Sequence, residues 1–181
     1  MSDGRSDLDY MQLALQEAAR CEPVETAFCV GCVIVVDSPS GAQVVLATGY
    51  SRELPGNTHA EANALAKALE LDEREDALRQ ILHDAAAEVP LAVPKVEELL
   101  KSATVYTTLE PCSVRTSGLA PCADALVHAK VRRVVIGVGE PKDFVVCEGA
   151  ERLKNAEIEV EWLKGLEENC LVAARRSHPP Q

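Results

Sequence analysis

Three short segments of the sequence carry side chains that could bind a metal ion. His59 and Glu61 lie in the first segment, Cys112 follows Glu-Pro in the second, and Cys122 follows a proline after nine further residues. One neutral imidazole and two thiolates form the ligand set of a catalytic zinc site, which leaves a fourth position for water. Pro121 suits the first turn of a helix, whose positive end would favour the Cys122 thiolate. The pattern therefore predicts a zinc site made by His59, Cys112 and Cys122.

Glu61 is the carboxylate best placed to move protons at such a site. A glutamate that does not bind the metal can take a proton from metal-bound water and give it to the leaving group. Zinc deaminases use the pattern H-x-E followed by P-C-x-x-C. Here the tripeptide is present and each cysteine follows a proline, but the cysteines are further apart. Thr58-x-x-Glu61 is also the pattern of a capping box, so Glu61 could instead close the start of a helix.

A second cysteine pair, Cys29 and Cys32, has the spacing of a zinc knuckle or a redox pair. It lies in an apolar run that predicts a buried strand, in which alternate residues face opposite sides. The two thiols would then point apart, and we expect two small core residues. The remaining cysteines, Cys21, Cys147 and Cys170, show no partner pattern.

The elements that must position these residues alternate between strands and helices. Valine-rich runs that are apolar on both faces predict strands covered by helices on both sides. We expect strands at residues 28–36, 44–50, 103–109, 131–138 and 158–162, and helices at 6–21, from 58 onward, and at 122–130, 149–155 and 163–176. This order predicts an α/β fold, a three-layer α/β/α sandwich around a central mixed sheet of about five strands.

The length of 181 residues fits one domain, and we expect a single catalytic domain over residues 1–181. Residues 70–101 hold nine acidic against four basic residues and two prolines. We interpret this segment as a helical acidic insertion on the surface, of unknown role. The short tail at 177–181 is expected to fray.

Charge and hydropathy limit the partners of this chain. With 29 acidic and 18 basic residues, the net charge is −11, and such a chain repels phosphate backbones. We therefore expect a small-molecule partner and no nucleic acid. The first ten residues lack the apolar segment of a signal peptide, and no apolar run reaches the roughly 20 residues of a membrane-spanning helix. We expect no membrane association and a cytoplasmic, or else nuclear, location, where the seven cysteines stay reduced.

The motifs around these residues resemble those of the cytidine deaminase superfamily. Residues 28–32 are similar to the Phe-x-Val-Gly-Ala stretch that begins the sheet there. Residues 49–61, 106–113 and 137–141 resemble the riboflavin-pathway pyrimidine deaminases of the fungal type. The resemblance extends over nearly everything from Leu8 to Ala173.

This resemblance implies a specific reaction. The substrate would be a 2,5-diamino-6-(ribitylamino)pyrimidin-4-one 5′-phosphate, and zinc hydroxide would attack the ring carbon that carries an amino group. Glu61 would protonate the ring nitrogen and then the departing amine, which leaves as ammonia. His59, Cys112 and Cys122 would hold Zn²⁺, and Asn57 would bind the pyrimidine edge or the sugar-like chain. Proteins of this superfamily are commonly dimers or tetramers, and we expect a homodimer.

Three basic residues are candidates for binding the phosphate, on charge and loop position alone: Arg52, Arg115 and Lys142. For each, the alternative is a solvated surface cation, and we expect only one of the three to bind. Bacterial bifunctional enzymes of this pathway place a histidine and Pro-Pro-Cys between the two cysteines. Residues 113–121 differ from that pattern, and these 181 residues include no reductase domain.

Three other functions stay open at this point. A deaminase of a free nucleoside, nucleotide or base (cytidine, deoxycytidine monophosphate or guanine type) would use the same zinc chemistry. An editing deaminase of tRNA or another nucleic acid would need a basic face and stacking aromatics, and only 3% of this chain is aromatic. A non-catalytic zinc-binding subunit would be indicated by loss of Glu61, which is present, or by a fourth protein ligand.

Overall fold

Two layers of helices cover a central sheet whose three middle strands are buried on both faces. The computed structural model describes residues 4–83, 93–115, 118–141 and 147–176. The strands are β1 (Gly31–Asp37), β2 (Gln43–Tyr50), β3 (Thr104–Leu109), β4 (Arg133–Val138) and β5 (Glu159–Trp162). They form one mixed sheet in the order β2-β1-β3-β4-β5. β1 is antiparallel to both β2 and β3, whereas β3, β4 and β5 run parallel.

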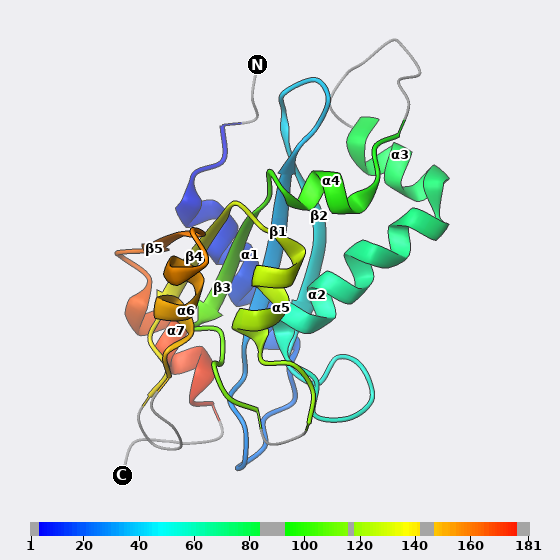
Figure 1. Cartoon of the computed structure of the whole chain (residues 1–181). Coiled ribbons are helices and arrows are strands. Elements are labelled where there is room, and N and C mark those ends of the chain that lie inside the picture. Colours follow the sequence, from blue (N-terminus) through cyan, green and yellow to red (C-terminus); the bar gives the residue numbers. More distant parts are fainter. Residues whose placement is uncertain (1–3, 84–92, 116–117, 142–146, 177–181) are drawn as a thin grey trace.

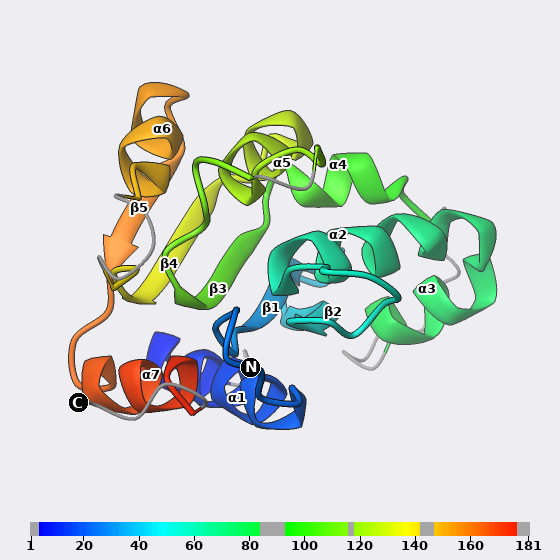
Figure 2. The ribbon, with the colours of Figure 1, turned by 90° about the horizontal axis from the view of Figure 1, so that it is seen from below.

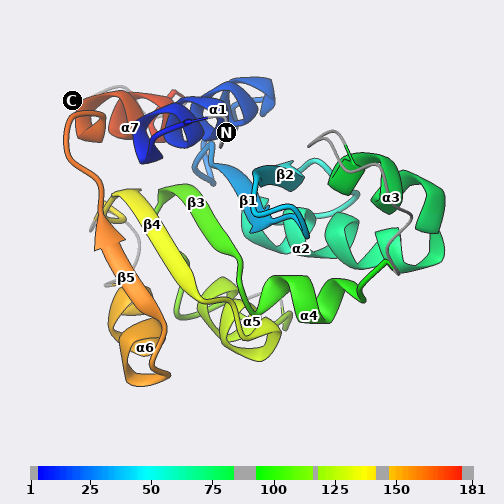
Figure 3. The ribbon, with the colours of Figure 1, turned by 90° about the horizontal axis from the view of Figure 1, so that it is seen from above.

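The helices divide between the two faces of this sheet (Figure 1). α1 (Asp7–Arg20) and α7 (Glu167–Ala174) cover one face, as Figure 2 and Figure 3 show from opposite directions. α2 (Ala60–Leu69), α5 (Cys122–Ala129) and α6 (Gly149–Asn155) cover the other face. The prediction of a three-layer α/β/α sandwich with a mixed sheet is confirmed.

α1 packs closely on β1 because a glycine lies between them. Ser6 caps the helix and exchanges hydrogen bonds with Asp9, and the two residues form a capping box. A Cβ atom at Gly31 would lie 1.9 Å from the Ala14 carbonyl oxygen, so any larger residue would push the helix away. α1 therefore buries Met11 and its neighbours directly against the sheet.

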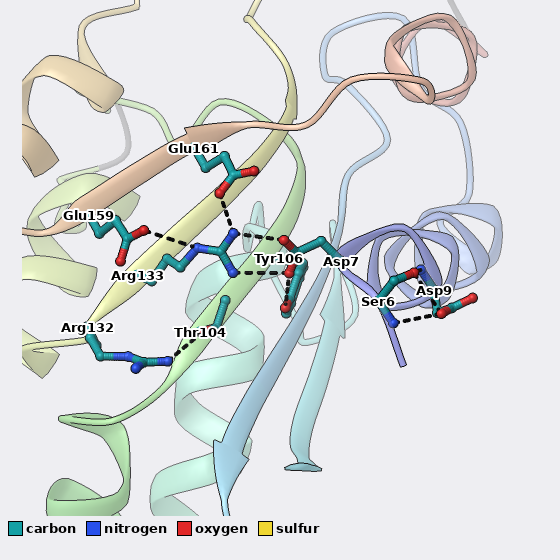
Figure 4. A network of polar contacts seen from close by, with 9 residues as sticks. All are labelled: Ser6, Asp7, Asp9, Thr104, Tyr106, Arg132, Arg133, Glu159 and Glu161. Atoms are coloured by element: carbon teal, nitrogen blue, oxygen red, sulfur yellow. Dashed lines mark hydrogen bonds and ion pairs between the residues drawn. The ribbon is translucent and has the colours of Figure 1, made fainter. Parts of the chain in front are cut away.

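A charged network ties the start of α1 to three strands (Figure 4). Arg133, at the start of β4, donates to both carboxylate oxygens of Asp7 at 3.0 and 2.8 Å, and also pairs with Glu159 and Glu161 on β5. The Tyr106 hydroxyl on β3 donates to Asp7 at 2.7 Å. These contacts lower the pKa of Asp7, chiefly through Arg133. The network lies at the opposite end of β4 from the candidate site described below.

The acidic segment at 70–101 is helical where the structure describes it. It forms η1 (Glu70–Glu73), α3 (Glu75–His83) and α4 (Val96–Leu100), and residues 84–92 lie outside the described ranges. Its inward side chains belong to the main core cluster together with those of β1 and α2: Leu71, Leu78, Leu82, Val96, Leu99 and Leu100. The segment thus contributes buried apolar surface to the core beneath α2. The tail at 177–181 also lies outside the described ranges.

The last helix is shorter than the sequence predicts. The Leu163 N–H donates to the Ile136 carbonyl at 2.9 Å, which prolongs the pairing of β5 with β4. Gly165 then turns the chain at a positive φ, and α7 begins only at Glu167. Within the described ranges, no helix is both long enough and apolar enough to cross a bilayer.

Candidate active site and metal centre

The three predicted metal ligands meet at the edge of the sheet where the parallel strands β3 and β4 end. His59 directly precedes α2, Cys112 follows β3, and Cys122 is the first residue of α5. The chain returns tightly from β3 to α5: the Ala123 N–H donates to the Cys112 carbonyl at 3.1 Å. The Cys122 N–H donates to the Cys112 sulfur at 3.3 Å, so the helix start stabilises negative charge on that sulfur.

The donor atoms have the separations that a tetrahedral zinc ion requires. They all lie within 4.8 Å of one another, and His59 Nδ1 is 3.5 Å from the sulfur of Cys112 and 3.5 Å from that of Cys122. Tetrahedral bonds of about 2.0 Å to nitrogen and 2.3 Å to sulfur place these atoms about 3.6 Å apart. No second group of three such donors exists within the described ranges. The site therefore fits zinc with three protein ligands.

The electrostatics of the thiols also suit a cation. Hydrogen bonds from Cys122 and His59 lower the pKa of Cys112 to about 4, against the opposing effect of burial. The hydrogen bond between His59 and Cys112 is also the main cause that raises the pKa of His59. The hydrogen bond that Cys122 gives to Cys112 raises the pKa of Cys122 itself. A bound dication would displace the shared proton and hold both cysteines as thiolates.

Glu61 lies beside these donors and is buried, with only 3% of its surface exposed. Burial is the main cause that raises its pKa. The Thr107 hydroxyl lies 3.3 Å from Glu61 Oε1 and 2.9 Å from the Leu109 carbonyl oxygen. The capping-box interpretation of Glu61 is wrong: no side chain caps α2, and the Thr58 hydroxyl donates to the carbonyl of Leu54 instead.

A cavity of about 160 Å³ opens onto these residues. His59, Glu61 and Cys112 line it, as do the predicted residues Arg52 and Asn57. The other lining residues are Thr26, Ala27, Phe28, Val30, Ser51, Thr58, Leu109, Glu110 and Glu140. The cavity is therefore small, partly apolar and bordered by several carboxylates, which suits a small polar ring.

The sequence alone did not identify two of these carboxylates, Glu110 and Glu140, as site residues. Glu110 Oε1 accepts a hydrogen bond from the Ala150 N–H at 2.9 Å, which fixes the start of α6 against the site. Glu140 follows β4, and burial is the main cause that raises its pKa. The signal for Glu140 was topological, because the ends of the parallel strands β3 and β4 meet at one edge. In the sequence, Glu140 appeared only as part of the motif at residues 137–141.

The candidate phosphate ligands have different surroundings. The Arg52 guanidinium donates to the carbonyls of Phe28 and Glu22, and its Nε is buried without a partner in the described structure. Arg115 donates to the Asn57 carbonyl at 2.6 Å, close to the cavity entrance. Lys142 lies outside the described residues.

The chain matches known proteins along most of its length. Residues 5–138 match the family model of the cytidine and deoxycytidylate deaminase zinc-binding region. A diaminohydroxyphosphoribosylamino-pyrimidine deaminase of Schizosaccharomyces pombe is 39% identical over 173 residues, which cover 96% of this chain and 36% of that protein. The chain thus spans about a third or less of the first curated relatives that it matches.

Solved structures share both the fold and part of the sequence. The Rib2 deaminase of Aspergillus oryzae, a C-terminal deletion mutant, has 28% identity and a TM-score of 0.71, over 96% of this chain and 93% of that one. The same deaminase has also been solved in complex with DARIPP. RibD of Acinetobacter baumannii has 31% identity and a TM-score of 0.66, over 94% of this chain and 38% of that one. With its family match over residues 5–138, this chain belongs to the cytidine and deoxycytidylate deaminase family, which is defined by its zinc-binding region.

Proposed function

We propose that this chain is a zinc-dependent hydrolytic deaminase that consists of a single domain. Its substrate would be a 2,5-diamino-6-(ribitylamino)pyrimidin-4-one 5′-phosphate, and the reaction would belong to riboflavin biosynthesis. The observation that carries this proposal is a group of three zinc donors beside a buried carboxylate, with His59, Cys112 and Glu61 lining one cavity. The names of the Schizosaccharomyces pombe relative and of the DARIPP complex support the substrate class. A cavity that admits one ring and not a duplex agrees with a small-molecule substrate.

The metal would be held by His59 Nδ1 and the sulfurs of Cys112 and Cys122. When bound, zinc lowers the pKa of a coordinated water and so supplies the nucleophile at neutral pH. The three protein donors leave one position of a tetrahedron for that water. α2 begins directly after His59 and α5 begins at Cys122, so the positive ends of both helices lie beside the donors and favour the thiolates.

Glu61 would carry the protons of the reaction. Its carboxylate takes a proton from the nucleophilic water and passes it to the ring nitrogen next to the attacked carbon. It would then take the second proton, from the hydroxyl group now on the ring carbon, and give it to the amine, so that the C–N bond breaks, ammonia leaves and the ring carbon becomes a carbonyl. Burial raises the pKa of Glu61, which helps it to hold the proton between these steps. The Thr107 hydroxyl keeps the carboxyl group oriented.

Asn57 and Glu140 would bind the polar edges of the pyrimidine. Both line the cavity, Asn57 beside the metal ligand His59 and Glu140 from the end of β4. A diaminopyrimidinone presents several N–H donors, which a carboxylate accepts well, while an amide can serve both donors and acceptors. We assign the ring to the space between these two residues.

Arg115 is the residue that we propose for the phosphate. Arg52 is committed to carbonyl oxygens of the neighbouring wall, whereas Arg115 contacts only the Asn57 carbonyl among the described residues. The carbonyl that it contacts belongs to Asn57, two residues before the metal ligand His59, so the guanidinium lies near the metal site. A phosphate at the end of the ribityl chain would therefore meet Arg115 at the rim of the cavity.

We propose that the chain forms a homodimer and that the contact between the two copies is a groove between α2, α4 and α5. These three helices lie side by side in Figure 2 and Figure 3. The groove has a volume of about 880 Å³ and an apolar floor that includes Leu65, Leu69 and Ala125. Charged residues of both signs also line the groove: Glu97, Lys101, Asp124 and Lys130. A surface that joins an apolar floor to both charges can pair with a second copy of itself across a two-fold axis.

Ammonia release from the ribitylamino diaminopyrimidinone 5′-phosphate tests the reaction. We expect turnover by the zinc-loaded protein, and a loss of about 10²-fold to 10⁴-fold in kcat in Glu61→Gln, which keeps the size of the side chain but cannot accept the proton. Zinc content should be unchanged in this variant. Cytidine, deoxycytidine monophosphate and guanine serve as comparison substrates. Preferred turnover of any of these three would contradict the substrate, and full activity of Glu61→Gln would contradict the mechanism.

The phosphate contact is tested by comparing the substrate with its dephosphorylated form. Arg115→Gln should raise KM by about tenfold for the phosphorylated substrate, because it removes one charge-assisted hydrogen bond. The KM of the dephosphorylated compound should not change. Lys154→Gln, at an exposed position on α6, is the matched control for loss of a positive charge. An equal rise in KM for both compounds would show that Arg115 does not bind the phosphate.

Sedimentation velocity tests the proposed dimer. The wild-type chain should sediment as a species with the mass of two chains. Leu69→Glu should sediment as a monomer, because the substitution places a charge in the apolar groove. Leu69 is 45% exposed, so the substitution should leave the fold intact. Val172→Glu, at a residue 63% exposed on α7, is the control on the other face of the sheet. A monomeric wild-type chain, or dissociation by the control alone, would overturn this interface.

A further inference from the structure

A second pair of thiols lies next to the cavity and takes no part in the metal site. Cys21 ends α1, Cys29 precedes β1, and both are buried, at 2% and 0% exposure. Arg52 Nη2 lies 2.8 Å from the Cys21 sulfur and 3.7 Å from the Cys29 sulfur. Cys32, by contrast, packs in the core beneath α2, so the C-x-x-C spacing does not bring its thiol to Cys29. The partner of Cys29 is Cys21.

The side chains that the Arg52 guanidinium contacts in the described structure are cysteines and not carboxylates. Its other contacts are the carbonyls of Phe28 and Glu22, and no acidic side chain pairs with it in the described structure. A hydrogen bond between the two thiols lowers the pKa of Cys29 to about 6 and raises that of Cys21. Arg176, which caps the end of α1 through carbonyl oxygens, adds to the lowering at Cys29. One thiolate and one thiol therefore share this place.

Arg52 connects this thiol pair to the wall of the cavity. Its guanidinium holds the Phe28 carbonyl, and its backbone N–H donates to the Thr58 carbonyl at 2.7 Å. Arg52 itself has a positive φ of 63°, a conformation that residues other than glycine seldom adopt. Phe28, Arg52 and Thr58 all line the cavity. A change at the sulfurs can thus reach the cavity wall at Phe28 through the Arg52 side chain and at Thr58 through the Arg52 backbone.

We propose that Cys21 and Cys29 form a redox-modification site whose oxidation to a disulfide by a peroxide alters the substrate cavity through Arg52. The Cys29 thiolate attacks one peroxide oxygen, the O–O bond breaks, and Cys29 becomes a sulfenic acid. The Cys21 thiol then gives up its proton and attacks the Cys29 sulfur, so that an S–S bond forms and the S–O bond breaks. Two thiols are oxidised in total, and one hydrogen peroxide is reduced to two waters.

The cover over the pair is thin enough for a small oxidant to enter by local opening. Residues 22–26 lie outside every helix and strand apart from the single bridge between Val24 and Ala27. Glu22, Pro23, Glu25 and Thr26 in this turn are exposed. Opening of such a turn costs far less free energy than global unfolding. We therefore expect oxidation that is slower than that of an exposed thiol but complete.

The disulfide removes the negative charge that faces Arg52. The guanidinium then keeps only carbonyl partners, so the orientation of the side chain that contacts the Phe28 carbonyl is less fixed. We expect KM of the deaminase to rise by about threefold or more, with full recovery after dithiothreitol. This readout rests on the proposed function, so a second readout is needed that does not. Hydrogen–deuterium exchange should increase at residues 22–30 and 51–59 on oxidation.

The experiment treats the zinc-loaded protein with one equivalent of hydrogen peroxide and maps the disulfides by mass spectrometry without reduction. We expect a Cys21–Cys29 linked peptide, unchanged zinc content, and the changes in exchange and KM given above. Cys21→Ser should form no disulfide and keep its KM after peroxide. Cys170→Ser, which removes a buried thiol on α7, is the control and should respond as the wild type does.

Three results would overturn the proposal. These are no Cys21–Cys29 link, a link without altered exchange at the cavity wall, or equal sensitivity to peroxide in Cys21→Ser. If untreated protein deaminates nothing while the link forms and the exchange changes, the thiol site stands and only the proposed function fails.

Discussion

The site depends on how closely the start of α5 returns to the end of β3. Two backbone N–H groups of that helix bind the carbonyl and the sulfur of Cys112, and this fixes both sulfurs 3.5 Å from His59. Helix positions in turn depend on small core side chains, such as Ala64 and Ala123, which let α2 and α5 approach the sheet. The metal geometry is therefore a consequence of core packing, and a larger core residue at either position would disturb the donors first.

Much of this site could be predicted from sequence, because its signals are local. His59, Cys112 and Cys122 each lie at a junction between an element and a loop, and residue type with order along the chain suffices to suspect a metal. The ambiguity of Glu61 was also local, since a capping box and a proton shuttle share one pattern, and only the burial of its carboxylate separates them. The layers of the fold followed from apolar strands that alternate with helices.

What could not be predicted depends on contacts between distant segments. Arg52 was one of three candidates for binding the phosphate, but its partners come from the turn after α1, some thirty residues earlier. Glu140 gave no signal of its own, because it reaches the cavity only through the parallel pairing of β3 and β4. The acidic stretch at 70–101 was interpreted from its charge, whereas its spaced leucines complete the core beneath α2. In each case the tertiary environment decides the role of the residue.

The most direct test of this account is X-ray absorption at the zinc edge of the purified protein. We expect one zinc per chain, with two sulfur ligands at about 2.3 Å and two nitrogen or oxygen ligands at about 2.0 Å, one of them from exchangeable water. Cys112→Ser should lower the sulfur count by one. A site with four protein ligands, or zinc bound without sulfur, would contradict the open three-ligand centre on which the proposed chemistry rests.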